Sequence, residues 1–393
     1  MAKLIGNAPN QVPTNADLGS MAFEDRTNYI TKGASVHQPY RNIIINGDMS
    51  IAQRGTSSSS VSTPGYYSVD RFRISLENAG TFTVSQSSDV PTGQGFQKSF
   101  KLDCTTADTS LVSGAINTFE QRIEGQNLVY LKKGTSNAES VTVSFWVKTN
   151  KTGTYVFELI DNNNSRHIAQ TFTVDSSSTW EKKTLTFVGD TSGALTYDNS
   201  TAMTIRIWLS AGSNFQGGTL PSSWLNASGT NRAVGQTVNL ADSTANEWYI
   251  TGVQLEAGTT ASDFEFLPYD VNLGRCQRYF EKTFNQGVTP GASVTMADRR
   301  TGITFTGSQV GIYSEYSVTK RANPTITIYR GNNAGSSSSG TINLYNLSAW
   351  VESSSITAFT SLQNSFSADP GGFSITPGYA YIVDYNYTAD AEL

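Results

Sequence analysis

Histidine and cysteine, the side chains most often used for nucleophilic and zinc chemistry, are almost absent from this chain. Its 393 residues include two of each. Cys104 and Cys276 lie far apart and in no metal-ligand spacing, so each is expected to be a small buried apolar residue rather than half of a disulfide. The sequence therefore argues against a zinc site and against a Cys-His nucleophile.

The acidic residues give no catalytic pattern either. Glu256 and Glu265 are the nearest candidates for an acid pair, with Asp263 beside them, but they fall where a domain junction is expected. Asp70 and Arg71 are expected to form a structural ion pair or hydrogen-bond hub. The chain contains no Gly-x-Ser-x-Gly elbow, phosphate loop or HExxH helix. We therefore expect no catalytic residue and no enzyme activity.

Aromatic residues beside polar ones are the remaining pattern with a chemical meaning. A pyranose has apolar C–H faces and a polar rim, so sugar sites combine an aromatic platform with hydrogen-bonding side chains. Trp146 lies on the polar face of its expected strand, and Trp208 shares such a face with Arg206. These three residues form a candidate carbohydrate-binding surface if both strands line one sheet. The alternative is that a loop or a neighbouring subunit covers the tryptophans. Trp224, on the long segment 211–243, is a further candidate for an external contact.

The composition of the chain is that of an all-β protein. Charged residues make up 15% of it, and Ser, Thr, Asn and Gly take their place, which suits short strands joined by tight turns. A net charge of −5 offers no basic surface for nucleic acid. No apolar run approaches the ~20 residues needed to span a bilayer, and no signal-peptide core is visible. Synthesis in a cytoplasm, without membrane insertion, is therefore expected.

Residues 42–268 are expected to form a two-sheet β-sandwich of jelly-roll type, because short alternating runs follow one another with Gly-, Asn- and Ser-rich turns between them. In the clearest run the apolar residues share one strand face: Val141, Val143, Phe145 and Val147. The expected strands are Asn42–Asp48, Asp70–Leu76, Thr81–Gln86, Gln97–Cys104, Ser140–Lys148, Gly153–Ile160, Ile168–Val174, Glu181–Val188, Ala202–Ser210 and Trp248–Leu255. Glu120–Tyr130 is the one stretch expected to form a short helix.

Residues 1–41 have no helix or strand period and are expected to form an extended arm. Leu18, Met21 and Phe23 are apolar residues with no domain of their own to enter, so they are expected to become ordered on a partner. The alternative is a leader that stays disordered.

Residues 269–393 are expected to form a separate small β domain. Its clearest strand places tyrosines at period two between Tyr379 and Tyr387, a face suited to a subunit interface or a sugar-reading surface. Lys320-Arg321 is expected in a solvated turn. The loops at Gly331–Gly340 and Asp369–Gly372 are expected to be external contact points.

Several segments of the middle region match known motifs in their order and spacing. They are an opening Asn46-Gly47-Asp48, an aromatic-Asp-Arg-aromatic segment at Tyr66–Phe72, a central strand at Val143–Lys148 and the start of the next one at Thr179–Lys183. Together these resemble carbohydrate-binding modules of jelly-roll type. Trp248–Lys282 resembles the seam between such a jelly roll and a C-terminal β domain in bacteriophage tail-fibre proteins, and Pro13–Asp25 looks like their attachment segments.

The resemblance also bears on calcium. Many such modules hold a structural calcium with an acid of the opening motif and an aspartate on the last strand. Here Met49 follows Asp48, and Thr251 occupies the place of the last-strand acid, so oxygen ligands for a hard cation are depleted. We therefore expect no cofactor and no metal, with Asp48 as a weak calcium candidate.

The resemblance implies a homotrimeric subunit of the virion tail, made in the host cytoplasm. The arm would dock on phage tail or adaptor proteins, and residues 269–393 would be the distal tip that binds a host surface glycan or protein. Several weak contacts would then add up to firm adhesion. Two alternatives stay open. One is a structural head-decoration or tail-assembly protein without receptor binding. The other is a polysaccharide-cleaving tailspike, which needs paired carboxylates in a cleft.

Overall fold

Antiparallel sheets make up nearly all of the regular secondary structure in the computed structural model, which describes residues 40–292, 299–331 and 340–393. Residues Asn42–Leu393 form one compact unit. The three residues expected to mediate attachment, Leu18, Met21 and Phe23, lie outside the described residues, as does most of the expected contact loop at 331–340. The all-β fold class is confirmed.

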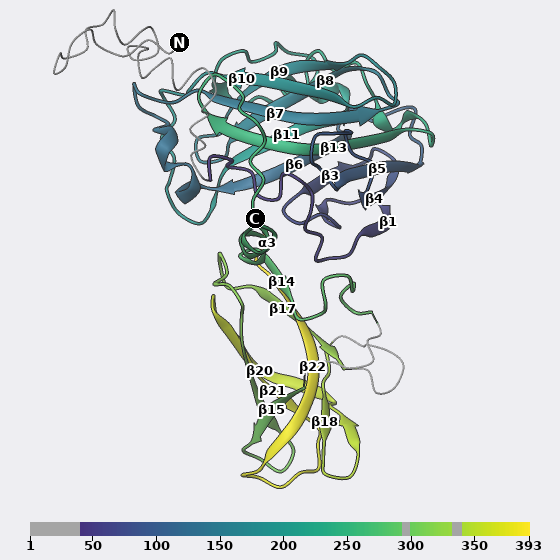
Figure 1. The fold of residues 1–393 in the computed structure, drawn as a ribbon, viewed down its shortest axis with the longest axis vertical. Helices are drawn as coiled ribbons and strands as arrows, with labels where there is room; N and C mark the ends of the chain where they lie inside the picture. The colour runs from purple at the N-terminus through teal and green to yellow at the C-terminus, as the bar shows by residue number, and fades with distance from the viewer. Residues whose placement is uncertain (1–39, 293–298, 332–339) are drawn as a thin grey trace, which may run out of the picture. The chain divides into compact units, whose positions relative to one another are not determined.

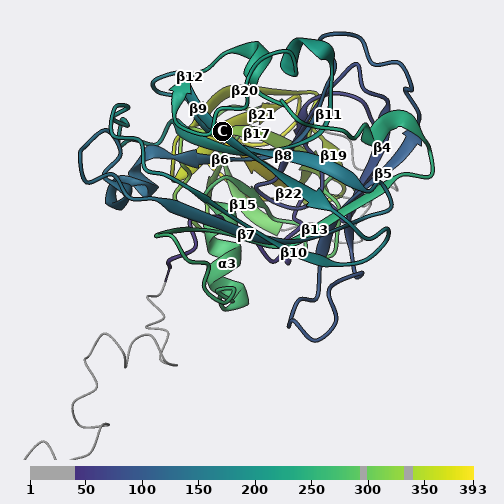
Figure 2. The same ribbon diagram turned by 90° about the horizontal axis from the view of Figure 1, so that it is seen from above.

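Two sheets pack face to face over residues 57–257 (Figures 1 and 2). The first has the strand order β1 (Ser57–Val61), β4 (Thr81–Ser87), β5 (Ser99–Thr106), β13 (Glu247–Ala257), β7 (Val141–Thr149) and β10 (Glu181–Phe187). The second has the order β12 (Leu225–Asn226), β9 (Arg166–Val174), β8 (Gly153–Asp161), β11 (Thr201–Ala211), β6 (Ile116–Glu124), β3 (Arg73–Glu77) and β2 (Gly65–Tyr66).

The core between these sheets consists of the strand faces that alternation indicated. The predicted apolar face of β7 is buried, and its Phe145 stacks on Phe157 of the opposite sheet with ring centroids 5.9 Å apart. Trp248 of β13 meets Phe119 of β6 across the same core, at 5.3 Å. Such aromatic contacts between sheets add to the stabilisation from burial alone. The jelly-roll prediction is therefore confirmed in its architecture.

Two local predictions were wrong. The apolar run Asn42–Asp48 is buried but forms no strand, because Asn46 has a positive φ of 62°. The Asn46 side chain also binds the backbone of Ile51 in both directions, which fixes a loop. The expected helix Glu120–Tyr130 is instead the end of β6 followed by 3₁₀ turns, since β6 pairs with β3 and β11 on its two edges.

A third sheet follows helix α3 (Tyr269–Gln277) and is organised around one long strand, β22 (Ala380–Asp390). Its order is β19 (Trp350–Glu352), β18 (Asn343–Tyr345), β22, β15 (Arg299–Thr304), β16 (Val310–Glu315), β21 (Ser365–Gly371) and β20 (Ser355–Ser361). Two further strands, β14 (Phe280–Lys282) and β17 (Thr325–Arg330), pair with the C-terminal half of β22.

The tyrosines of β22 form the core of this C-terminal sheet rather than a surface. Tyr381, Tyr385 and Tyr387 are buried against β16, β17 and β21, whereas Tyr379, just before the strand, is 60% exposed. The expected contact loop at Asp369–Gly372 was also wrong, because Asp369–Gly371 ends β21 and pairs with β20. Alternation therefore identified the two faces of β22 but not which partners cover them.

The cysteine prediction was tested as well. Cys104 and Cys276 are both free and buried, as predicted. Among the described residues, no helix is long and apolar enough to span a membrane.

Candidate functional site

The predicted carbohydrate-binding surface is not assembled in this structure. Trp146 lies on β7 of the six-stranded sheet, whereas Arg206 and Trp208 lie on β11 of the seven-stranded sheet. The two strands therefore do not line one sheet, which was the condition for a shared surface. Trp146 is partly buried on its own sheet.

Trp208 is covered by the long segment that follows its strand. The residue is fully buried, and its ring lies 5.1 Å from that of Phe215 and packs against Ala211 and Ala233. Its indole Nε1 donates a hydrogen bond to Glu158 Oε2 at 3.0 Å. A buried indole N–H that already has its acceptor is a structural feature, so the alternative of a covering loop is correct for Trp208.

Arg206 takes part in a buried ionic network around Glu158. Arg232 Nε lies 3.0 Å from Glu158 Oε1, and His167 Nδ1 lies 2.9 Å from the same oxygen. Burial by itself raises the pKa of Glu158, but the hydrogen bond from His167 and the charges of Arg232 and Arg206 lower it to about 2. Arg206 itself donates to Glu120 at 2.8 Å. These contacts hold the covering segment on the sheet, and they keep Glu158 ionised rather than ready to donate a proton.

Trp224 is also a covering residue rather than an external contact. It is 9% exposed, and its Nε1 donates to the carbonyl of Val188 at 2.8 Å. Lys133 Nζ lies 4.7 Å from the centre of its ring and is itself paired with Asp190 at 2.9 Å. The prediction of an outward-facing Trp224 was therefore wrong, because the segment folds back over the sandwich.

Asp48, the calcium candidate, is surrounded by hydrogen-bond donors. Its Oδ1 accepts from Asn272 Nδ2 and from Ser50 Oγ, each at 3.1 Å. Burial raises the pKa of the Asp48 carboxyl. Thr251 donates its hydroxyl to the carbonyl of Lys98 at 2.8 Å. These contacts tie the opening motif to helix α3, and this donor set does not fit calcium, which takes about six to eight oxygen ligands.

A polar pocket of about 570 Å³ lies beside the C-terminal half of β22. Thr325, Thr327 and Tyr329 of β17 line it, together with Thr388 and Asp390 of β22. Thr327 pairs directly with Thr388, and Thr325 with Asp390. Because side chains of alternate residues point to the same side of a sheet, this register gathers three hydroxyls on one face. The pocket was not predicted from the sequence, because β17 and the end of β22 lie far apart in the chain.

Arg54 forms the charged wall of the pocket. Its Nη2 lies 3.0 Å from Asp390 Oδ2, its Nη1 lies 3.4 Å from Glu392 Oε1, and its Cζ is 3.8 Å from the centre of the Phe280 ring. Burial by itself lowers the pKa of Arg54, but Glu392 and Asp390 raise it above its usual value. Arg54 therefore stays charged and is fixed in place by two carboxylates and a ring.

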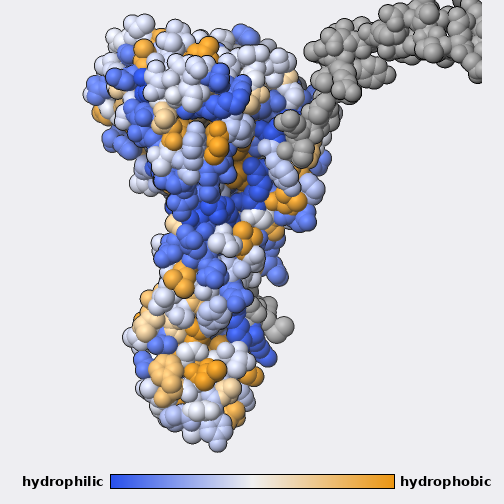
Figure 3. Space-filling model, turned by 90° about the vertical axis from the view of Figure 1, so that its left-hand side faces the viewer, coloured by the Kyte–Doolittle hydropathy of each residue, from blue (hydrophilic) through white to orange (hydrophobic). Residues whose placement is uncertain are grey.

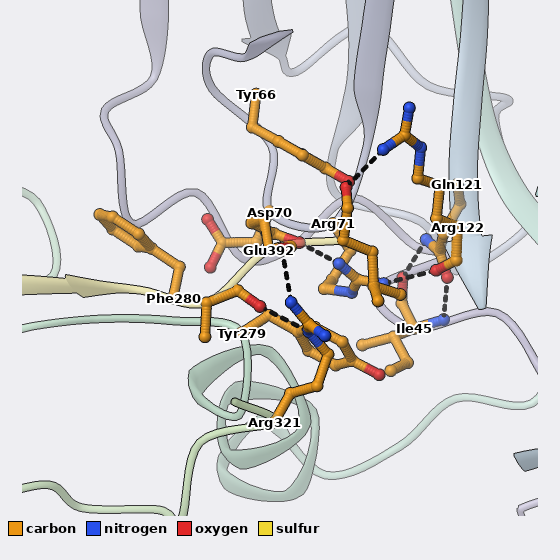
Figure 4. A network of polar contacts seen from close by, with 12 residues as sticks. Ile45, Tyr66, Asp70, Arg71, Gln121, Arg122, Tyr279, Phe280, Arg321 and Glu392 are labelled. Atoms are coloured by element: carbon orange, nitrogen blue, oxygen red, sulfur yellow. Dashed lines mark hydrogen bonds and ion pairs between the residues drawn. The ribbon is translucent and has the colours of Figure 1, made fainter. Parts of the chain in front are cut away.

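Next to the pocket, the end of the described chain is held by a network of polar contacts (Figure 4). Arg71 forms an ion pair with Glu392 and donates to the carbonyl of Arg122 at 2.6 Å. Arg122 and Tyr66 in turn donate to the carbonyl oxygen of Leu393, at 2.9 and 3.0 Å. Arg71 is thus the hub that the sequence predicted, although its partner is Glu392 rather than Asp70.

A second set of contacts extends this network from Arg321. Its Nε donates to the carbonyl of Ala391 at 2.7 Å and its Nη2 to that of Glu392 at 2.9 Å. The neighbouring Lys320 is buried and binds Glu281 at 2.6 Å. The expectation of a solvated turn at Lys320-Arg321 was therefore wrong.

Asp70 accepts a hydrogen bond from the backbone N–H of Gln53 at 2.8 Å, and burial raises its pKa to about 6.

The C-terminal sheet also carries apolar side chains at its surface (Figure 3). The exposed large residues in this part of the chain include Ile303, Phe305, Tyr313, Phe359, Tyr379 and Ile382. Ile382 of β22 pairs with Tyr345 on one side and Thr301 on the other, so its exposed side chain lies in the middle of a sheet face. The large tryptophans of the sandwich, in contrast, are buried or partly buried.

Comparison with known proteins gave matches only among solved structures; no protein-family model and no curated protein matches the chain. One match is the enzymatically active domain of bacteriophage CBA120 tailspike protein 4, at 15% identity and a TM-score of 0.32, over 56% of this chain and 22% of that one. Another is TmCBM61, determined with β-1,4-galactotriose, at 11% identity and a TM-score of 0.28, over 55% and 99%. A third is the CBM22-1 xylan-binding domain from Paenibacillus barcinonensis Xyn10C, at 12% identity and a TM-score of 0.25, over 53% and 100%.

Proposed function

We propose that this protein is a non-enzymatic tail-fibre subunit of a bacteriophage virion that adheres to glycans on the host cell. The observation that carries the proposal is the location of the exposed aromatic side chains that could contact a sugar. In the sandwich, Trp208 is buried under the segment 211–243, and Trp224, which belongs to that segment, is buried as well. In the C-terminal part, Tyr313 and Tyr379 are 58% and 60% exposed. Accessible aromatic side chains beside polar ones suit recognition of a sugar surface.

The carboxylates of the polar pocket favour binding over cleavage. Glycoside hydrolysis usually needs one carboxylic acid and one carboxylate on either side of the scissile bond. Asp390 and Glu392 are both engaged by Arg54, and Glu392 also by Arg71. Both carboxylates therefore converge on the same guanidinium rather than standing on opposite sides of a bond to be cleaved. This arrangement supports an adhesin rather than a polysaccharide-cleaving spike.

In the proposed assembly, three copies associate, the residues before the sandwich dock on tail or adaptor proteins, and the C-terminal sheets face the host. Exposed apolar residues such as Ile382 and Ile303 on a sheet face provide a surface on which copies of the chain can pack. Several weak sugar contacts on one fibre then act together, which raises the overall affinity without any strong single site.

The proposal is tested by measuring how fluorescently labelled full-length protein binds intact candidate host cells. Periodate treatment of the cells, which destroys vicinal diols, should abolish binding if glycans are the receptor. The double variant Tyr313→Ser/Tyr379→Ser should reduce binding at least severalfold. Tyr197→Ser is the matched control, since Tyr197 is 45% exposed on the sandwich. A folded oligomer that binds none of the plausible hosts would instead favour a structural role in virion assembly.

A further inference from the structure

The face shared by β17 and β22 presents threonine hydroxyl groups that no described residue binds. Within the described part of the chain, the side chains of Thr325, Thr327 and Thr388 make no hydrogen bond, although all three line the pocket. Threonine hydroxyls that are free to donate and accept are suited to a ligand that is itself rich in hydroxyl groups. The strand register fixes their positions, so the row is formed before any ligand arrives.

An aromatic ring closes the row of hydroxyls at one end. Tyr329 follows Thr327 on the same face of β17 and is partly buried. Its ring is held edge-on by Phe284, with centroids 5.3 Å apart. A ring beside hydroxyls matches the apolar face and polar rim of a pyranose. The ring of Phe280, at the opposite end, is already occupied by Arg54, so Tyr329 is the platform available to a ligand.

The charges of the pocket select an uncharged ligand. Arg54 is balanced by Asp390 and Glu392, and Glu392 is balanced in turn by Arg71. A charged ligand would therefore find no side chain among these four without an ion-pair partner, and would gain little from its charge. Asp390 is 42% exposed, and each of its oxygens accepts one hydrogen bond, from Arg54 and from the backbone N–H of Glu392. A carboxylate has about four lone-pair positions, so Asp390 can still accept from ligand hydroxyls.

From these observations we infer that the pocket beside β22 binds a neutral mono- or disaccharide, stacked on Tyr329 and hydrogen-bonded by Thr327, Thr388 and Asp390. A volume of about 570 Å³ falls in the range of small-molecule sites, about 300–1,000 Å³. This inference rests on the proposed glycan adhesion and names the class of sugar and its site. It places recognition on the C-terminal strands rather than on the sheet faces of the sandwich.

The test uses full-length protein and saturation-transfer NMR followed by titration with galactose, glucose and lactose. N-acetylneuraminic acid and glucosamine serve as anionic and cationic comparators. Thr327→Val keeps the shape of the side chain and removes its hydroxyl, so affinity for the neutral sugar should fall about five- to tenfold. Tyr329→Leu should weaken it further. The matched controls are Thr171→Val, on an exposed strand position of β9, and Tyr197→Leu.

The outcomes separate this inference from the function on which it rests. The pocket is supported if the affinity for neutral sugars falls in Thr327→Val and Tyr329→Leu but not in the controls. Thermal melting shows whether both variants are folded. Preference for a charged sugar overturns the charge argument. If the wild-type protein binds host cells but no neutral sugar, or if the variants bind as the wild type does, the pocket is wrong while adhesion stands. Loss of cell binding alone would remove the adhesion proposal and leave the pocket intact.

Discussion

Arg71 and Glu392, which are 321 positions apart in the chain, form a buried ion pair. Their side chains are 1% and 5% exposed, and the Arg71 guanidinium also lies 3.5 Å from the centre of the Tyr279 ring. Arg71 lies between β2 and β3 of the sandwich, whereas Glu392 follows β22. The residues after β22 are therefore part of the packing of the sandwich itself.

Substitution of Glu392 should destabilise the whole compact unit. Glu392→Gln removes the charge that compensates Arg71, and breaking a buried pair on one side costs about 3–5 kcal/mol. The measurement is the free energy of unfolding in urea. Glu139→Gln is the control, because Glu139 pairs with Lys132 at the surface, with side chains 40% and 53% exposed, and should cost less than about 1 kcal/mol. Equal effects of the two variants would contradict the role assigned to Arg71.

Asp70 should make the protein less stable as the pH rises from about 4 to about 6. Burial raises its pKa in the folded protein to about 6, above the value of about 3.9 expected in the unfolded chain. Between these values the folded state binds more protons, so stability decreases with rising pH. The difference in melting temperature between the wild type and Asp70→Asn should therefore shift against the wild type from pH 4 to pH 7. A pH-independent difference would show that Asp70 does not titrate in this window.

Glu158 should have the opposite effect at lower pH. Its folded pKa of about 2 lies below the value of about 4.3 for an unfolded glutamate. Its contribution is complete above about pH 4.3 and is lost as the pH falls through the folded pKa. Acid unfolding monitored by tryptophan fluorescence should therefore begin at a higher pH in Arg232→Gln, which lacks one partner of Glu158. An unchanged acid transition in that variant would show that the network contributes nothing to acid stability.

Trp208 should matter for stability and not for adhesion. Trp208→Ala leaves a cavity beneath the segment 211–243 and removes a donor to Glu158, at a cost of about 3–5 kcal/mol. Binding of the folded variant to host cells should equal that of the wild type at a temperature below its melting transition. If the variant instead lost cell binding while its stability was unchanged, the result would indicate that the sugar-binding site lies on the sandwich.

Ile382 should influence the oligomeric state. The wild-type protein is expected to be a trimer by size-exclusion chromatography with light scattering. Ile382→Glu puts a charge on the apolar face of the C-terminal sheet, where the side chain is 45% exposed, and should shift the equilibrium toward monomer. Leu347→Glu, at a residue 72% exposed outside the strands, is the control. A wild-type monomer that adheres normally would rule out the trimer.

Alternation predicted most strands of the sandwich and their buried faces, because a period of two depends only on neighbouring residues. The same reasoning identified the strand faces of Trp208 and of the β22 tyrosines, but it could not identify the elements that cover them. The cover of Trp208 includes Phe215 and Ala233 from the following segment. That of Tyr385 comes from strands far away in the sequence. Which face is solvated is a tertiary property that a single strand does not encode.

The pocket and the ionic network lay beyond sequence reasoning for a related reason. Thr327 meets Thr388 only through the register of β17 on β22, and register depends on turns and packing elsewhere. Arg321 is charged and follows Lys320, so the sequence indicated a solvated turn at this position. Its guanidinium instead satisfies backbone carbonyls at the end of β22. A structural role for a partly buried arginine becomes recognisable only once its acceptors have been located.

The double attachment of the C-terminal part has a mechanical consequence. The chain enters this part through residues 258–268 and helix α3, and it returns to the sandwich through Glu392 and Leu393. A ligand held at Thr388 and Asp390 lies within a few residues of that return point. A pulling force between the protein and a bound cell would therefore be transmitted from β22 to Arg71 and Arg122 through these contacts. The covalent connection through residues 258–268 would carry force at the same time. Two parallel load paths let a small domain resist shear without relying on one flexible connection.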